Sequence, residues 1–222
     1  MTILLYNNDT NRMERFERDA RDPMPYADSS LLVGEFRGTS RSQLLWTQRR
    51  TMDSWVSFRR IWGQPIYVRH CFRRVGEGGH ANQSQHYAGT AFDCAHNLSS
   101  AQRAQMRASA QSSGLWTYVE PAYLTPTWVH FDTRTLPPAC FTGGYPLTRR
   151  GSVGVYVLIL QDALNIVTRA GLGLDGMFGV ATEDAVGFFQ ATRGLTADGI
   201  VGCVTWQLLT NSAVGAGFSP YA

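Results

Sequence analysis

One turn motif occurs twice near the C-terminal end of this 222-residue chain, and it constrains the fold more than any other feature. Asp175-Gly-Met-Phe-Gly-Val-Ala-Thr182 returns 23 residues later as Asp198-Gly-Ile-Val-Gly-Cys-Val-Thr205, and an apolar periodic segment follows each copy. Asp-Gly favours a tight turn, the second glycine allows another, and the threonine is expected to cap a helix through its hydroxyl. The repeat therefore predicts two stacked turn-helix units.

A third helix is expected just before the repeat. Apolar residues recur at the three-to-four spacing of an amphipathic helix between Val153 and Arg169, and Gly171 is expected to end it. Prolines and small residues interrupt the pattern upstream, at Leu136-Pro-Pro138 and Thr142-Gly-Gly144. We therefore predict a first domain over residues 1–135, a linker over 136–149, and a three-helix domain over 150–222.

The C-terminal pattern resembles the peptidoglycan-binding three-helix domain found on many wall hydrolases. The resemblance covers roughly residues 150–210 and rests on Leu160-Gln161, on a Phe188-Phe189-Gln190 core, and on the two D-G-x-[FV]-G-x-x-T copies. It implies peptidoglycan, through its glycan or its stem peptide, as the partner. The alternative is that the same glycines and aromatic residues only build a small bundle.

Composition excludes several function classes. All 20 basic residues are arginine, so lysine Schiff bases, pyridoxal phosphate enzymes and P-loop nucleotide sites are ruled out. The net charge of +3 is mild and the arginines are scattered, which gives no support for nucleic-acid binding but suits an anionic polymer such as a cell wall.

The apolar segments of the chain are short. The longest, Val153 to Leu160, is far below the length of a membrane span, and the first residues carry no pattern of a signal peptide. We therefore expect no membrane insertion. We also expect the protein to be a monomer. Because a wall-directed protein must reach the wall, we expect extracytoplasmic action, after secretion with a leader removed or after release on lysis.

Two segments of the first domain carry candidate chemistry. Ser84-Gln-His86-Tyr-Ala-Gly89-Thr-Ala-Phe-Asp93 is followed by Thr127-Trp-Val-His130-Phe-Asp132. A hydrolytic zinc site needs three N or O protein ligands and an open position for water. His86, Asp93 and His130 would supply that set for one Zn²⁺ ion. On a helix, His86 and Asp93 would be about 10.5 Å apart along the axis, so Gly89 is expected to turn the chain back along a strand. Strand alternation then turns His130 and Asp132 away from Val129 and Phe131.

The pattern S-x-H-x-x-G-x-A-x-D with a later W-x-H resembles the zinc D-Ala-D-Ala carboxypeptidase family, which includes phage L-alanyl-D-glutamate endopeptidases. The similarity begins upstream, where Phe58 to Val68 matches the family's helix and G-x-P-I-x-V strand, and covers roughly residues 45–135. It implies that Arg73 meets a substrate carboxylate or carbonyl oxygen, with Arg74 as the neighbouring alternative or a surface ion pair as the competing interpretation. Ser84 either contacts substrate or caps a turn.

The general base departs from the family pattern. Many members carry a carboxylate three residues before the last histidine ligand, and here that position is Thr127, which cannot accept a proton at neutral pH. Glu120 is our first candidate because Pro121 and Pro126 suggest a loop that folds it over the metal. Asp132 is the second candidate, with a role behind the ligands as its alternative. Loss of catalysis is a third possibility.

The expected fold is α+β, a small antiparallel sheet with flanking helices followed by an all-α three-helix bundle. Residues 1–44 are expected to wrap the catalytic domain or to form a helix from Asp9 to Ala20. The four cysteines are widely spaced, so a cysteine-only zinc site is disfavoured, while buried free thiols and one disulfide both stay open.

The first functional hypothesis is a zinc peptidase that hydrolyses peptidoglycan stem peptides as a D-alanyl-D-alanine carboxypeptidase. The alternatives are an L-alanyl-D-glutamate endopeptidase of the endolysin type and a non-catalytic wall-binding protein. His80 lies in a glycine-rich stretch and is expected to be exposed, with substrate contact as the alternative, whereas His70 and His96 receive no role.

Overall fold

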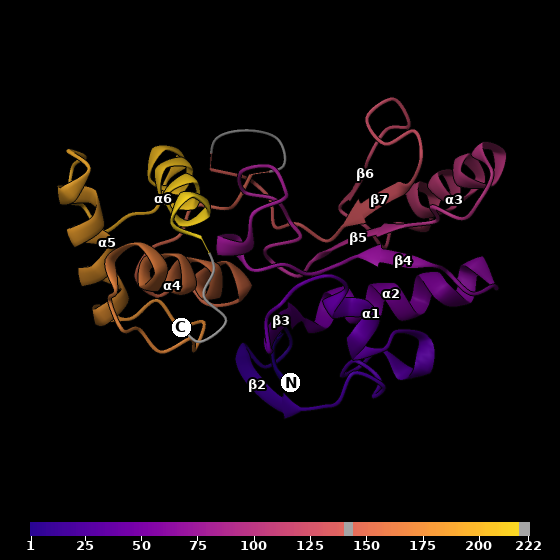
Figure 1. The fold of residues 1–222 in the computed structure, drawn as a ribbon, viewed down its shortest axis with the longest axis horizontal. Helices are drawn as coiled ribbons and strands as arrows, with labels where there is room; N and C mark the ends of the chain where they lie inside the picture. The colour runs from indigo at the N-terminus through magenta and orange to yellow at the C-terminus, as the bar shows by residue number, and fades with distance from the viewer. Residues whose placement is uncertain (140–143, 218–222) are drawn as a thin grey trace.

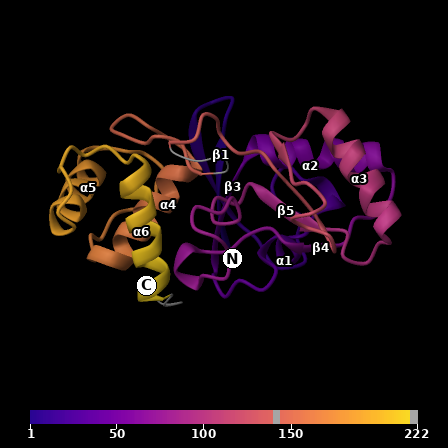
Figure 2. The same cartoon turned by 90° about the horizontal axis from the view of Figure 1, so that it is seen from above.

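Two small β-sheets make up the N-terminal part of the protein, and three helices lie together at the other end (Figure 1). The computed structural model describes residues 1–139 and 144–217. Seen from above, the helices α4, α5 and α6 are again grouped at the end opposite α3 (Figure 2). The expected mixture of sheet and helix, followed by a helical C-terminal region, is confirmed at this level, whereas one antiparallel sheet was expected and the structure has two sheets, one of them with a parallel strand pair.

The first sheet is built by the start of the chain. It has the order β2-β1-β3, with β1 (Thr2–Asn7) antiparallel to β2 (Arg12–Glu17) and parallel to β3 (Leu44–Gln48). The predicted helix from Asp9 to Ala20 is therefore wrong. The Asn7 side chain accepts hydrogen bonds from the backbone N–H groups of Asp9 and Thr10, which fixes a turn. The chain then returns as β2 alongside the buried strand β1.

The second sheet carries the candidate site. Its order is β4-β5-β7-β6, all antiparallel, with strands β4 (Val68–His70), β5 (Ala91–Cys94), β7 (Val129–Asp132) and β6 (Tyr118–Val119). Helix α3 (Ser100–Ser113) connects β5 to β6 and begins at Ser99, whose hydroxyl accepts from the N–H of Gln102. Shorter helical segments precede β3 and β5, namely η1 (Asp28–Ser30), α1 (Val33–Arg37) and η2 (Val75–Glu77).

Helix α2 (Arg49–Trp62) covers the apolar face of this sheet. It ends at Gly63, which has φ 72°, in agreement with the predicted helix-to-strand passage around Phe58 to Val68. Its Trp55 stacks on Phe92 of β5 with ring centroids 4.5 Å apart, and its Phe58 packs edge-on against Phe131 of β7 at 5.2 Å. One face of the sheet is therefore closed by aromatic side chains.

The three predicted C-terminal helices are present as α4 (Val155–Thr168), α5 (Val180–Thr192) and α6 (Cys203–Ala216). Each copy of the repeat is held by a glutamine of the preceding helix. Gln161 accepts from Gly176 N–H and donates to Asp175, Met177 and Thr182, and Gln190 makes the same contacts to the second copy. The repeat is thus a repeated hydrogen-bond network.

Two details of the predicted bundle are wrong. Thr182 and Thr205 cap no helix, because Gly179 and Gly202 occupy the cap positions and the threonine hydroxyls face the glutamines instead. Phe189 is fully buried, whereas Phe188 is 59% exposed and does not belong to the core.

The C-terminal helices share a core with the N-terminal part. Helix α4 packs against α6, β3 and η2, and α6 also contacts η2. An ion pair between Arg74 and Asp162 of α4 crosses this boundary, with side chains only 8% and 1% exposed. Tyr145, in the predicted linker, is fully buried. The predicted division into a first domain over residues 1–135, a linker over 136–149 and a second domain over 150–222 therefore stays a prediction.

The structure contains both buried free thiols and a disulfide-bonded cysteine, the two alternatives that the sequence left open. Cys71 and Cys94 are buried free thiols, Cys203 is disulfide-bonded, and Cys140 lies outside the described residues. Among the residues described, no helix has the length and apolar character that crossing a membrane requires.

Candidate functional site

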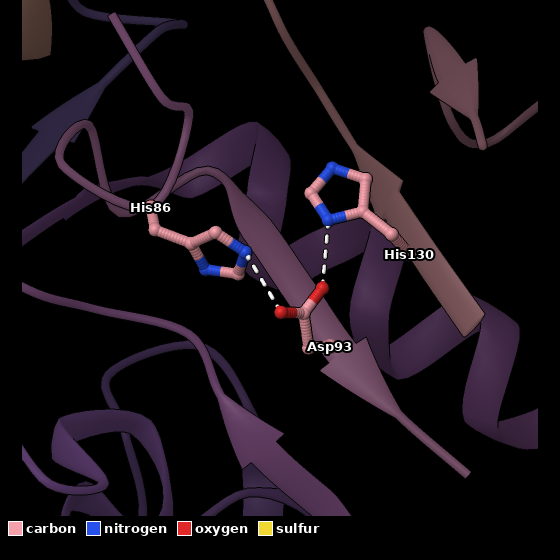
Figure 3. Close-up of side chains that lie close together, drawn as sticks. All are labelled: His86, Asp93 and His130. Atoms are coloured by element: carbon pink, nitrogen blue, oxygen red, sulfur yellow. Dashed lines mark hydrogen bonds and ion pairs between the residues drawn. The ribbon is translucent and has the colours of Figure 1, made fainter. Parts of the chain in front are cut away.

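The three predicted ligands meet at one point (Figure 3). His86 Nε2 lies 3.3 Å from Asp93 Oδ2, and His130 Nδ1 lies 2.8 Å from Asp93 Oδ1. One candidate ligand atom from each residue falls within 4.8 Å of the others, and the three side chains are at most 12% exposed. This donor set of two imidazoles and one carboxylate matches the protein ligands of a catalytic zinc ion.

A glycine turn brings the first two ligands together. Gly89 has φ 66°, and a Cβ atom at this position would lie 2.0 Å from the carbonyl oxygen of Trp46. Only glycine fits there, so the chain passes close to β3, reverses and enters β5 with Asp93 facing His86. The predicted turn is confirmed.

Strand alternation brings in the third ligand. Asp93 pairs with His130 and Ala91 pairs with Asp132 across β5 and β7. Val129 and Phe131 point the other way and are fully buried in the aromatic core. The predicted separation of a ligand face from a core face is therefore confirmed.

Hydrogen bonds behind the histidines fix their ring orientation. His86 Nδ1 donates to the carbonyl oxygen of Cys71 at 3.1 Å, which leaves Nε2 directed at Asp93. His130 Nε2 lies 3.1 Å from Asp132 Oδ2, which leaves Nδ1 directed at Asp93. Such outer partners are what metal-binding histidines require. The residues present therefore fit a metal ion.

The electrostatics of the site favour a positive charge. Burial lowers the pKa of His130, but hydrogen bonds to Asp132 and Asp93 outweigh burial and raise it to about 10. Burial raises the pKa of Asp93, but the charges and hydrogen bonds of His86 and His130 hold it below its ordinary value. The carboxylates of Asp93 and Asp132 thus stabilise a positive charge on the His130 ring.

Glu120 lies next to the ligands in the sheet. Tyr118 pairs with Asp132 and Val119 with Phe131, and the Glu120 N–H then donates to the His130 carbonyl oxygen at 2.9 Å. Because directly opposed residues of an antiparallel pair share a face, Glu120 and His130 lie on the ligand face. Its carboxylate accepts no hydrogen bond from the residues that the structure describes.

Asp132 is held in a different way. It is fully buried, accepts from the Arg134 backbone N–H and Nε at 3.0 and 2.8 Å, and also contacts Arg134 Nη2 and His130. Burial raises the pKa of Asp132, but the hydrogen bonds from Arg134 and His130 hold it below its ordinary value. This geometry suits a residue that orients His130.

Two cavities flank the ligands. One of about 310 Å³ includes His130, Glu120, Tyr118, Ser84 and Arg134 in its lining. The other, of about 340 Å³, includes Asp93, Thr127, Arg69 and the histidines 70, 80 and 96. The ligand set is therefore accessible from both sides.

The remaining predicted residues lie at different distances from this centre. Ser84 lines the first cavity, and its hydroxyl accepts from the His86 N–H at 3.3 Å, so it stabilises the turn before the ligand. Thr127 lies exposed at the rim of the second cavity. Arg74 is committed to Asp162. Arg73 donates to Thr39 Oγ1 at 2.6 Å and lines neither cavity, so its predicted role stays a prediction.

Two further residues lie near the ligands: His80, which was expected to be exposed, and Arg69, to which the sequence assigned no role. His80 stacks on His86 with ring centroids 4.3 Å apart and is partly buried, so its predicted loop exposure is wrong, while substrate contact, its alternative, stays a prediction. Burial lowers its pKa to about 3, which makes it a neutral ring. Arg69 lines the second cavity beside Asp93 at a β-bulge between β4 and β5. No local signal in the sequence indicates such a bulge.

The segment 82–85, just before His86, is held by the C-terminal part of the chain. Thr210 of α6 donates to the Asn82 side chain at 2.6 Å. The Tyr145 backbone N–H donates to Gln83 Oε1 and its hydroxyl to the Ser84 carbonyl oxygen. Tyr156 of α4 donates to Gln85 Oε1 at 2.9 Å. The first cavity is therefore built with help from α4 and α6.

Comparison with known proteins identifies the C-terminal domain. Residues 154–209 match the family model described as "Putative peptidoglycan binding domain". The chain therefore contains a peptidoglycan-binding domain, which supports peptidoglycan as its partner and association with the cell wall. A protein of Kitasatospora aureofaciens, described as "Uncharacterized protein in bpoA1 3'region", is 40% identical over 77 residues. The match covers 32% of this chain and 65% of that relative, so the chain spans less than two thirds of the relative's length.

Proposed function

We propose that this protein is a zinc-dependent peptidase that hydrolyses peptidoglycan stem peptides. The observation that carries the proposal is the meeting of His86, Asp93 and His130 within 4.8 Å, beside a free carboxylate and in a chain that contains a peptidoglycan-binding domain. The resemblance of the S-x-H-x-x-G-x-A-x-D and W-x-H segments to zinc D-Ala-D-Ala carboxypeptidases supports the same conclusion.

Zinc held by these residues would supply a Lewis acid for the scissile carbonyl and would lower the pKa of the attacking water. The chain's own groups do the rest. Cys71 and Asp132 orient the two imidazoles, and Glu120, on the ligand face beside His130, accepts the proton of the water and delivers it to the leaving amine.

Asp132 acts through His130 in this proposal. Its carboxylate is occupied by Arg134 and His130 and is fully buried, so it has no free lone pair directed at the cavity for a new proton. Glu120 lines the cavity, and its carboxylate has no such partner in the part of the chain that the structure describes. We therefore keep Glu120 as the first candidate for the general base and Asp132 as the second.

D-alanyl-D-alanine carboxypeptidase is our first choice for the bond cleaved. Arg69 beside Asp93 forms no ion pair within the described residues, and a guanidinium suits the carboxylate of a terminal D-alanine. L-alanyl-D-glutamate endopeptidase is the second choice, because cavities on both sides of the ligands leave room for a peptide that continues past the scissile bond.

Two expectations complete the proposal. The protein acts as a monomer at the wall, outside the cytoplasm, where its peptidoglycan-binding domain keeps the peptidase near its substrate. A non-catalytic wall-binding protein is the competing function, favoured by the threonine at position 127.

The test combines metal analysis with product analysis. We expect the protein to bind one zinc ion and to release D-alanine, or a stem peptide cut at L-Ala-D-Glu, from purified wall fragments, identified by mass. His86→Ala and His130→Ala should lose zinc and hydrolysis but keep wall binding. Zinc retained in full by either variant contradicts the ligand set, and zinc without any product identifies the non-catalytic alternative.

A further inference from the structure

Gln83 has an unusual environment beside the candidate centre. Its side chain is 1% exposed and its backbone is held in the left-handed region with φ 58°. Oε1 accepts from the Tyr145 N–H at 2.9 Å, whereas Nε2 has no hydrogen-bond partner among residues 1–139 and 144–217. A buried amide donor without a partner is unfavourable by about 1–3 kcal/mol in the free protein. An unsatisfied buried group in a folded protein calls for an explanation, and a ligand that accepts its hydrogen bond is one.

The position of Gln83 connects this donor to the site. The residue lines the cavity that also contains Glu120 and His130, three residues before the ligand His86. Asn82, Gln83 and Ser84 are held in place by α6 and Tyr145, so the strained backbone is fixed before any ligand arrives. Strained residues with fixed surroundings concentrate at binding sites.

The charges in this cavity favour a neutral acceptor. Glu120 contributes a negative charge, while the positive charge of Arg134 is already paired with Asp132. A substrate carboxylate would be repelled by Glu120, whereas an amide carbonyl would complete the Gln83 donor at no such cost. Arg69, which forms no ion pair within residues 1–139 and 144–217, lines the opposite cavity and suits the carboxyl end of a peptide.

We propose that Gln83 is a substrate-binding residue that donates a hydrogen bond from Nε2 to a backbone carbonyl of the stem peptide, on the N-terminal side of the scissile bond. The inference rests on the proposed peptidase function and adds a direction to it. The peptide crosses the ligands with its amino side in the Gln83 cavity and its carboxyl side in the Arg69 cavity.

The experiment pairs a variant with a substrate analogue. Gln83→Glu keeps the oxygen that accepts from Tyr145 and removes the donor, and Gln83→Met removes both polar atoms without adding charge. The substrates are a stem peptide ending in D-Ala-D-Ala and its alkene isostere, which lacks the carbonyl before the acyl D-alanine. Gln64→Glu, at an exposed position, is the control for the same chemical change.

We expect kcat/KM for the normal peptide to fall about 10-fold in the Gln83 variants, mainly through KM, with zinc content and Tm unchanged in at least one of them. The isostere should be about 10-fold poorer for the wild type and no poorer still for the variants. Equal kinetics of the wild type and the variants on the normal peptide would overturn the role of Gln83. The same 10-fold penalty for the isostere in the wild type and in the variants would overturn it as well. A wild type that holds zinc yet cleaves no stem peptide overturns the proposed function itself, and with it this inference.

Discussion

Replacing Glu120 by glutamine should separate proton transfer from metal binding. The Glu120 carboxylate accepts no hydrogen bond from the described residues, so the isosteric amide breaks no contact that supports the fold. We expect kcat to fall by about 10²–10⁴-fold, the usual contribution of a general base, which corresponds to about 3–5 kcal/mol of barrier. Zinc content and Tm should stay at wild-type values.

Asp132→Asn provides the contrast. It removes the charge that compensates Arg134 in a pair whose side chains are 8% and 0% exposed, so it should destabilise the fold by about 3–5 kcal/mol. It should also weaken zinc binding about 10–100-fold, because His130 loses its orienting partner. The remaining activity should recover when zinc is supplied in excess.

The assay measures saturation kinetics by mass spectrometry of the released product, zinc by elemental analysis, and Tm by calorimetry on the same preparations. A Glu120→Gln variant with a wild-type kcat, together with an Asp132→Asn variant that is inactive with zinc fully bound, would reverse the two roles. Normal turnover by both variants would mean that another group accepts the proton.

Three further predictions concern stability and the integrity of the site. Asp162→Ala should lower the free energy of unfolding in urea by about 3 kcal/mol, because it removes the carboxylate that pairs with the buried Arg74. Arg15→Gln, at an exposed ion pair, should change the free energy of unfolding by less than about 1 kcal/mol. Equal effects of the two substitutions would contradict the burial argument. Gly89→Ala should abolish stoichiometric zinc binding and lower Tm strongly, because the added Cβ would meet the Trp46 carbonyl oxygen. The control Gly63→Ala, at φ 72° and with open space around it, should lower the free energy of unfolding by only about 1 kcal/mol. A Gly89→Ala protein that binds zinc fully would refute the close approach. Gln161→Leu should destabilise the chain by about 1–3 kcal/mol by leaving Gly176 N–H unpaired, which thermal unfolding measures, and an unchanged Tm would show that the repeat network contributes nothing.

The parts of the site that could be predicted from sequence are those set by local geometry. Alternation along a strand decides which face His130 takes, and a glycine between His86 and Asp93 signals the reversal that lets them meet. The helix ending at Gly63 and the repeated Asp-Gly turns likewise depend on neighbouring residues alone. In each case a residue and its nearest neighbours contain the information.

The parts that escaped prediction depend on residues far apart in the chain. The segment expected as a helix from Asp9 to Ala20 forms strand β2 because β1 lies beside it, and β1 in turn pairs with β3 about forty residues later. The stacking of His80 on His86 and the bulge at Arg69 depend on how loops and strands pack. Thr182 was expected to cap a helix, but the distant Gln161 uses its hydroxyl. Tertiary partners override local preference at these positions.

The hydrogen bonds from Tyr145, Tyr156 and Thr210 to the segment 82–85 have a consequence for recombination of such proteins. A natural or engineered recombination would exchange the peptidoglycan-binding domain at residues 154–209 for another binding domain. Here a transplanted domain would lack Tyr156 and Thr210, whose hydroxyls hold the segment 82–85 at the first cavity. An exchange that preserves the first cavity therefore has to keep residues 145–156 and the side of α6 that contacts Asn82 together with the N-terminal part, so we expect the two parts of this chain to evolve together.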